Sequence, residues 1–255
     1  MHPDLSLALE LADAADDITM GRFGATDLVV DTKPDMTPVS EADRATEEMI
    51  RARLAAARPD DAVVGEEFPD TGGSGSGRRW IVDPIDGTKS YVRGIPVYAT
   101  LIALEEDGVL TLGVTSAPAL GRRWWATRGG GAFRDGERIR VSGVKTIDDA
   151  HLTYDSVGSF DVAGLTDQFL ALTRACWRSR GFGDFWQYAL VAEGAVDIAL
   201  EPSGLKIWDL APLLVLVEEA GGRFTDLAGD ARADNGSAVA TNGLLHDAVL
   251  TAMRP

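Results

Sequence analysis

The sequence predicts an α/β fold whose two parts differ in how helices and strands follow one another. The chain has 255 residues, of which 45% are hydrophobic, enough for a globular protein with a sizeable core. Up to about residue 145, most strand-like segments follow one another directly; beyond it, helices and strands alternate. No internal repeat is present. We therefore expect residues 1–145 to form an α+β part and residues 146–255 an α/β part of one compact unit.

Two amphipathic helices are expected near the N-terminus. Residues 4–20 carry leucine and alanine at helical spacing. A turn-rich stretch at residues 31–38 follows. Ser40 is a suitable N-cap for a second helix at residues 41–57, supported by Asp43 in its first turn. The two helices are therefore separated by a turn-rich connection.

Short apolar or alternating segments predict strands in the rest of the first part. These strands lie near residues 62–64, 79–82, 97–105, 109–116, 124–127 and 131–133. Asp107-Gly108 and Asp135-Gly136 are typical hairpin turns, so the sheet is mainly antiparallel. The stretch at residues 71–77 is rich in glycine and serine and is expected to be a flexible loop. A phosphate-binding loop is disfavoured, because no helix follows to offer its N-terminus to a phosphate.

The second part alternates between the two element types. Helices are expected near residues 164–174, 185–194, 207–220 and 243–253. Strands are expected near residues 151–154, 177–180, 196–200 and 237–240.

Composition excludes several classes of partner. The net charge of −16 and the pI near 4.5 argue against binding to nucleic acid or to an anionic membrane surface. The single cysteine, Cys176, cannot form an internal disulfide, and neither a membrane-spanning apolar run nor a basic N-terminal leader is present. We therefore expect a cytoplasmic protein. A phosphorylated substrate would need local positive charge to enter such an acidic molecule.

Acidic residues recur where predicted strands or loops end. They are Glu66-Glu67, the run Asp83-Pro84-Ile85-Asp86-Gly87-Thr88, and Asp209. Pro84 forces the chain out of its strand, so the carboxylates of Asp83 and Asp86 and the carbonyl of Ile85 can face one pocket. Such oxygen ligands suit Mg²⁺, and sites of this kind typically direct water at phosphorus. Each piece alone is equally compatible with a surface carboxylate or a helix cap.

Other phosphatase mechanisms do not fit the sequence. A cysteine phosphatase requires arginine six residues after the nucleophile, whereas Phe182 stands six residues after Cys176. The Asp-x-Asp pattern of aspartyl-phosphate enzymes is replaced by Asp-x-x-Asp, and no Gly-x-Ser-x-Gly motif occurs. The three histidines lack a basic surrounding.

The chain resembles the inositol monophosphatase superfamily of Mg²⁺-dependent phosphatases over nearly its full length. Gly65-Glu66-Glu67, the run from Trp80 to Thr88, and Trp208-Asp209 followed by Gly221-Gly222 occur in the order typical of that family. The resemblance implies two or three Mg²⁺ ions per site. It implies that these are bound by Glu66, Asp83, the carbonyl of Ile85, Asp86 and Asp209.

The resemblance also implies roles for neighbouring residues. Thr88 and Asp43 are expected to orient the attacking water beside Glu66, and the amides of Gly87 and Thr88 to bind phosphate. Lys33 is expected beside the weakest metal site. The implied fold is a layered α-β-α-β-α sandwich, and the implied assembly is a homodimer.

The substrate hypothesis rests on Asp184 and Glu201. Asp184 stands where inositol phosphatases usually carry a small residue, and the run Gly183-Asp184-Phe185-Trp186 resembles the histidinol-phosphate phosphatases of this superfamily. Two carboxylates near the leaving group would favour a substrate with an amine or imidazolium, such as L-histidinol phosphate. Alternatives are an inositol-1-phosphate or broad sugar-phosphate phosphatase, a catalytically silent scaffold, and merely structural roles for Asp184 (an N-cap) and the aromatic residues.

Overall fold

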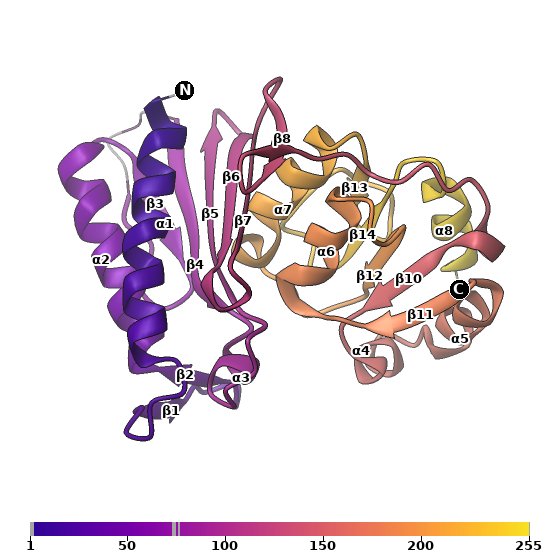
Figure 1. Cartoon of the computed structure of the whole chain (residues 1–255), viewed down its shortest axis with the longest axis horizontal. Coiled ribbons are helices and arrows are strands. Elements are labelled where there is room, and N and C mark those ends of the chain that lie inside the picture. Colours follow the sequence, from indigo (N-terminus) through magenta and orange to yellow (C-terminus); the bar gives the residue numbers. More distant parts are fainter. Residues whose placement is uncertain (1–2, 73–74, 76, 255) are drawn as a thin grey trace.

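Two sheets alternate with three layers of helices along the longest axis of the molecule (Figure 1). The structure is a computed structural model that describes residues 3–72, 75 and 77–254. Within these residues, one sheet has seven strands in the order β3-β4-β5-β6-β7-β8-β9. The other has five in the order β11-β10-β12-β14-β13. The predicted α-β-α-β-α sandwich is confirmed.

The larger sheet is mainly antiparallel, as predicted, with β3 and β4 as its parallel pair. Its strands are β3 (Ala62–Gly65), β4 (Arg78–Asp86), β5 (Ala99–Glu106), β6 (Val109–Ala117), β7 (Arg122–Thr127), β8 (Gly131–Arg134) and β9 (Glu137–Arg138). The short 3-10 helix η1 (Pro118–Leu120) joins β6 to β7. The predicted turns at Asp107-Gly108 and Asp135-Gly136 connect β5 to β6 and β8 to β9.

Helices α1 (Pro3–Arg22) and α2 (Glu41–Ala57) cover the outer face of this sheet (Figure 1). Their buried leucine, alanine and isoleucine side chains pack against Trp80 and the apolar residues of β4, β5 and β6. The small hairpin of β1 (Val30–Thr32) and β2 (Pro38–Ser40) lies between the two helices in sequence and delivers Ser40 to the start of α2. Ser40 caps α2 as predicted.

Helices α6 (Asp184–Ala192) and α7 (Ile207–Glu219) form the middle layer between the sheets (Figure 1). One buried cluster contains residues from both helices, from β4, β5 and β7, and from β12 and β14. Phe185 and Tyr188, each 1% exposed, belong to it, so their structural interpretation is confirmed. This apolar layer holds the end of β4 and the start of α7 in fixed relation.

The second sheet is mixed, because β10, β11 and β12 run parallel while β14 pairs antiparallel with β12 and β13. Its strands are β10 (His151–Tyr154), β11 (Arg178–Gly181), β12 (Ile198–Glu201), β13 (Arg223–Thr225) and β14 (Ala238–Thr241). The outer layer consists of α4 (Val157–Val162), α5 (Thr166–Ala175) and α8 (His246–Ala252), and the 3-10 helix η2 (Ile147–Asp149) precedes β10. The short elements α4 and β13 were not predicted, because neither is long enough to show a period.

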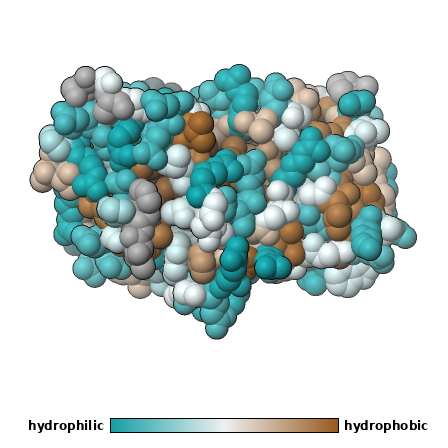
Figure 2. Space-filling view, turned by 90° about the horizontal axis from the view of Figure 1, so that it is seen from above, coloured by the Kyte–Doolittle hydropathy of each residue, from teal (hydrophilic) through white to brown (hydrophobic). Residues whose placement is uncertain are grey.

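The boundary at residue 145 falls between the two sheets, and the division into two parts stays a prediction. Part of the predicted loop at residues 71–77 (residues 73, 74 and 76) lies outside the described residues. None of the helices in the described chain is both long and apolar enough to cross a membrane. Figure 2 shows one face of the molecule, on which hydrophobic residues form small groups among hydrophilic ones.

Candidate active site

Three carboxylates from two distant segments meet at the end of β4. Asp83 and Asp86 lie in the last four residues of β4, and Asp209 lies in the first turn of α7. One oxygen of each lies within 4.8 Å of those of the other two. The prediction that the chain leaves the strand at Pro84 is wrong, because β4 continues to Asp86; Pro84 instead falls where the pairing of β4 with β5 is irregular, between Asp83 and Asp86. These three carboxylates therefore converge, and their role as metal ligands stays a prediction.

Backbone contacts fix the turn that follows β4. The side chain of Asp83 accepts a hydrogen bond from the N–H of Ile85 at 3.0 Å, and the hydroxyl of Thr100 donates to the carbonyl of Pro84 at 2.9 Å. Gly87 has φ +85°, and a Cβ there would lie 2.9 Å from the carbonyl oxygen of Val97. Only glycine combines this conformation with this close approach. Helix α3 (Thr88–Tyr91) then begins at Thr88.

Thr88 and Asp43 form the hydrogen-bonded pair that was expected. The hydroxyl oxygen of Thr88 lies 3.1 Å from Oδ1 of Asp43 and 2.9 Å from the carbonyl oxygen of Ile85. Asp43 is fully buried and also accepts hydrogen bonds from the N–H and the hydroxyl of Ser40, at 2.8 and 2.5 Å. The capping and functional interpretations of Asp43 are therefore compatible. Burial raises the pKa of Asp43, although the hydrogen bonds oppose this effect.

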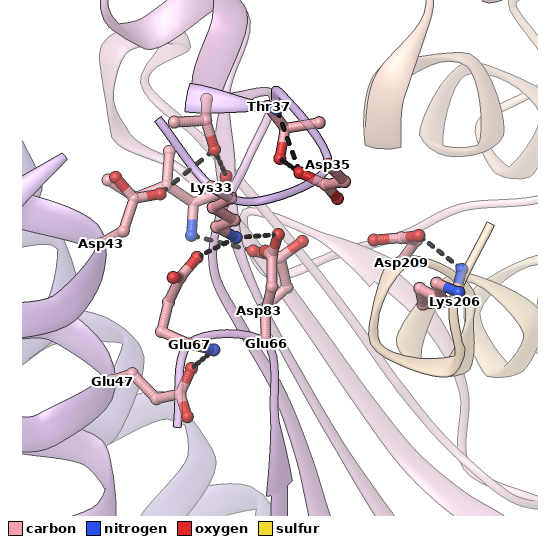
Figure 3. Close-up of polar contacts among 12 residues, drawn as sticks. Lys33, Asp35, Thr37, Asp43, Glu47, Glu66, Glu67, Asp83, Lys206 and Asp209 are labelled. Carbon is pink, nitrogen blue, oxygen red and sulfur yellow. Dashed lines mark hydrogen bonds and ion pairs between the residues drawn. The ribbon is translucent and has the colours of Figure 1, made fainter. Parts of the chain in front are cut away.

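Lys33 connects the β1–β2 hairpin to the end of β3. Its ammonium group lies 2.7 Å from Oε1 of Glu66 and 2.6 Å from Oε1 of Glu67 (Figure 3). Among the described residues, Glu66 is therefore placed beside Lys33 and not within the group of three carboxylates. Burial raises the pKa of Glu67 to about 7, although Lys33 counteracts the shift. One ammonium thus faces two glutamates at the edge of the site, so its charge is fully compensated there.

The two predicted substrate residues occupy different positions. Asp184 begins α6, and its Oδ2 would lie 3.2 Å from a Cβ placed on Gly87. The N–H of Phe185 donates to Oδ2 of Asp86 at 2.6 Å, which joins α6 to the carboxylate group. Gly183, and not Asp184, is the N-cap of α6, so the capping interpretation of Asp184 is wrong.

Glu201 ends β12 and is held by two side chains of α6. Its Oε2 accepts hydrogen bonds from Nε2 of Gln187 at 2.9 Å and from the hydroxyl of Tyr188 at 3.2 Å. Burial, with Asp155 and Asp209 nearby, raises its pKa well above the usual range. Glu201 therefore contacts α6, the helix that begins at Asp184.

A cavity of about 310 Å³ opens over these residues. Its lining includes Lys33, Asp35, Thr37, Pro38, Glu66, Gly87, Thr88, Lys89, Asp184, Gly204, Lys206, Trp208 and Asp209. Lys89 and Lys206 were not predicted as site residues, although Lys89 directly follows Thr88 and Lys206 stands three residues before Asp209. Lys89 and Lys206 supply local positive charge for an anionic substrate in this acidic protein, whereas Lys33 is paired with Glu66 and Glu67.

The donor set fits a hard divalent cation. Burial raises the pKa of Asp83 and Asp86 well above the usual range, and the neighbouring carboxylates add to the effect. Burial likewise raises the pKa of Asp209 to about 7. Crowded carboxylates with the carbonyl of Ile85 nearby are the ligand type that Mg²⁺ prefers. A cation bound here would relieve the repulsion between them.

Comparison with known proteins places this geometry in a family. The model of the inositol monophosphatase family matches residues 1–254. The chain belongs to the inositol monophosphatase family. A histidinol-phosphatase of Mycobacterium tuberculosis is 58% identical over 98% of this chain and 97% of its own, and one of Streptomyces coelicolor is 55% identical over 97% and 95%.

A solved structure has the same fold. The extragenic suppressor protein suhB of Bartonella henselae has a TM-score of 0.91 and 31% identity, with 98% of each chain covered. The sequence-based resemblance to the inositol monophosphatase family is thus confirmed. The roles of the individual site residues stay predictions; Lys33, Glu66, Gly87, Thr88, Asp184 and Asp209 line one cavity.

Proposed function

We propose that this protein is a Mg²⁺-dependent phosphomonoester hydrolase that converts L-histidinol phosphate to L-histidinol and inorganic phosphate, a reaction of histidine biosynthesis. The observation that carries the proposal is the near full-length similarity, at 58% and 55% identity, to two histidinol-phosphatases. The convergence of Asp83, Asp86 and Asp209 beside a cavity with three lysines agrees with it.

The metal-binding residues in this proposal are Glu66, Asp83, the carbonyl of Ile85, Asp86 and Asp209, for two or three ions. When bound, Mg²⁺ would supply positive charge for the phosphoryl oxygens and make a nearby water easier to deprotonate. Lys33 would lie beside the weakest metal site, Lys89 and Lys206 would attract the anionic substrate, and the amides of Gly87 and Thr88 would face its phosphoryl group.

The chain itself supplies the proton path. The hydroxyl of Thr88 can accept a hydrogen bond from water while donating its own proton to Asp43, 3.1 Å away. Ser40 holds Asp43 in place through two hydrogen bonds, so the hydroxyl of Thr88 is oriented towards a fixed acceptor. Asp43 and Thr88 would therefore orient the water beside Glu66, as the sequence analysis expected.

Asp184 is the better supported of the two substrate-reading residues. It lines the cavity, next to Gly87, whereas Glu201 is hydrogen-bonded to Gln187 and Tyr188 of α6 and does not belong to the lining. An amine or imidazolium on the leaving group would be attracted to this side of the cavity, and a neutral polyol would not. A homodimeric assembly and a cytoplasmic location are supported by the family resemblance and by the single cysteine, respectively.

The proposed specificity can be tested with Asp184→Asn. Asp184 has φ +46°, a conformation that asparagine tolerates well, so the variant removes charge and leaves the backbone unchanged. We expect kcat/KM for L-histidinol phosphate to fall about tenfold or more, with little change for inositol-1-phosphate. Equal losses on both substrates would remove Asp184 from substrate recognition.

A further inference from the structure

Glu47 is a fully buried carboxylate on α2 that has no place in the proposed chemistry. It stands four residues after Asp43 and four before Arg51, so the three lie on one face of the helix. Its Oε2 accepts a hydrogen bond from the backbone N–H of Glu67 at 2.8 Å, as Figure 3 shows. The buried acid thus contacts the backbone of the turn that carries Glu66.

A second set of contacts holds the same turn against α2. Oε1 of Glu47 accepts hydrogen bonds from Nε of Arg51 at 2.7 Å and from the N–H of Phe68 at 3.3 Å. Arg51 in turn donates from Nη2 to the carbonyl of Phe68 at 3.0 Å. Both backbone groups of Phe68 and the amide of Glu67 are therefore held by α2.

The turn passes so close to Glu47 that it depends on a glycine. A Cβ placed on Gly65 would lie 2.1 Å from Oε1 of Glu47, a separation that no relaxed side chain allows. Glu47 therefore packs directly beneath the last residue of β3. The Glu66–Glu67 turn cannot move relative to α2 without breaking the hydrogen bonds that Glu47 and Arg51, an ion pair within α2, make to the backbone of Glu67 and Phe68.

We infer that Glu47 is a positioning residue, which holds the Glu66–Glu67 turn so that Glu66 is presented to the metal. The inference rests on the proposed metal-dependent function of the site. Groups that orient a metal ligand through its surroundings typically change metal affinity by about tenfold to a hundredfold when they are removed. Because Asp43 lies one turn earlier on the same helix face, α2 sets the position of both the water-orienting pair and the metal-binding turn.

The test compares Glu47→Ala and Glu47→Gln with the wild type. Two quantities are measured: the Mg²⁺ concentration for half-maximal phosphate release, and the Mg²⁺ concentration for half of the metal-induced rise in the unfolding temperature without substrate. We expect Glu47→Ala to raise both concentrations about tenfold to a hundredfold. Glu47→Gln keeps one acceptor oxygen for the amide of Glu67 and should raise them less.

Two control variants separate positioning from general destabilisation. Leu54→Ala removes a buried side chain of the same helix away from the turn, and Glu48→Gln changes an exposed neighbour. Neither should change the Mg²⁺ dependence. An unchanged dependence in Glu47→Ala, or the same change in Leu54→Ala, would overturn the inference; if Glu47→Ala does not fold, Glu47→Gln decides. The measurement without substrate is independent of whether histidinol phosphate is the substrate.

Discussion

The charge of Asp83 is unfavourable in the fold unless a cation balances it. The side chain is 1% exposed and faces Glu66, Asp86 and Asp209, which together with burial raise its pKa. At neutral pH, which lies above the ordinary carboxyl pKa, the native state therefore carries repulsion that the unfolded chain lacks. The ionised carboxylate of Asp83 therefore lowers the stability of the cation-free protein.

Asp83→Asn should separate these two effects. We expect turnover at saturating Mg²⁺ to fall at least about a thousandfold, since several kcal/mol of transition-state stabilisation depend on the bound cation. Without Mg²⁺, the unfolding temperature should equal or exceed that of the wild type, because the repulsion is relieved. Phosphate release and thermal unfolding followed by circular dichroism measure the two quantities. Turnover near the wild-type level would contradict the metal assignment.

Thr88 can be examined with a matched pair of substitutions. Thr88→Val keeps the shape but removes the hydroxyl that lies 3.1 Å from Asp43, so kcat should fall about a hundredfold to ten-thousandfold. Thr88→Ser keeps the hydroxyl and should stay within about tenfold of the wild type. Steady-state kinetics at saturating Mg²⁺ distinguish the two variants, and similar kcat values for valine and threonine would exclude Thr88 from the proton path.

At the scale of elements, the turn between β4 and α3 is the most constrained connection of the site. Gly87→Ala places a Cβ 2.9 Å from the carbonyl oxygen of Val97 in a conformation with φ +85°. We expect a loss of about 1–3 kcal/mol in the free energy of unfolding and a fall in kcat, because Asp86 and Thr88 flank the turn.

Gly94→Ala is the control for Gly87→Ala. Gly94 also has positive φ, +71°, but a Cβ there meets nothing within 4 Å, so only the conformational cost of about 1 kcal/mol applies. Urea unfolding and kcat of the two variants can be compared directly. Equal effects on both quantities would show that the close approach to Val97 is unimportant.

His246 attaches α8 to the second sheet through two hydroxyls. Its ring nitrogens lie 2.9 Å from the hydroxyl of Thr225 on β13 and 3.1 Å from that of Thr241 on β14. Burial lowers the pKa of this fully buried imidazole to about 4. The unfolded chain therefore binds a proton that the native state does not, and stability is lost as pH falls from about 6.5 to 4.

The contribution of His246 is isolated by comparing the wild type with His246→Gln. The advantage of the wild type in free energy of unfolding should shrink by up to about 3 kcal/mol between pH 6.5 and pH 4, since one pKa unit corresponds to about 1.4 kcal/mol. Denaturant unfolding at several pH values gives this difference. A constant difference over that range would mean that the imidazole does not titrate as described.

At the scale of the whole molecule, the elements with a clear local pattern were predictable. The capped start of α2, the Asp-Gly hairpins and the Asp83–Thr88 turn follow from residue chemistry alone, and the layered sandwich followed from the family resemblance. The placement of Lys89, Lys206 and Glu47 could not be predicted, because it depends on how α2, α3 and α7 pack. Glu201 illustrates the same limit, since its position behind α6 is set by Gln187 and Tyr188.

The proposed function requires both bound Mg²⁺ and a particular substrate, L-histidinol phosphate. The most direct measurement is phosphate release with Mg²⁺ from L-histidinol phosphate and, in parallel, from inositol-1-phosphate, each repeated with excess EDTA. We expect much faster phosphate release from L-histidinol phosphate than from inositol-1-phosphate, and no release in excess EDTA. Preference for the inositol ester would contradict the proposed substrate, and release that persists in EDTA would contradict the metal-dependent site.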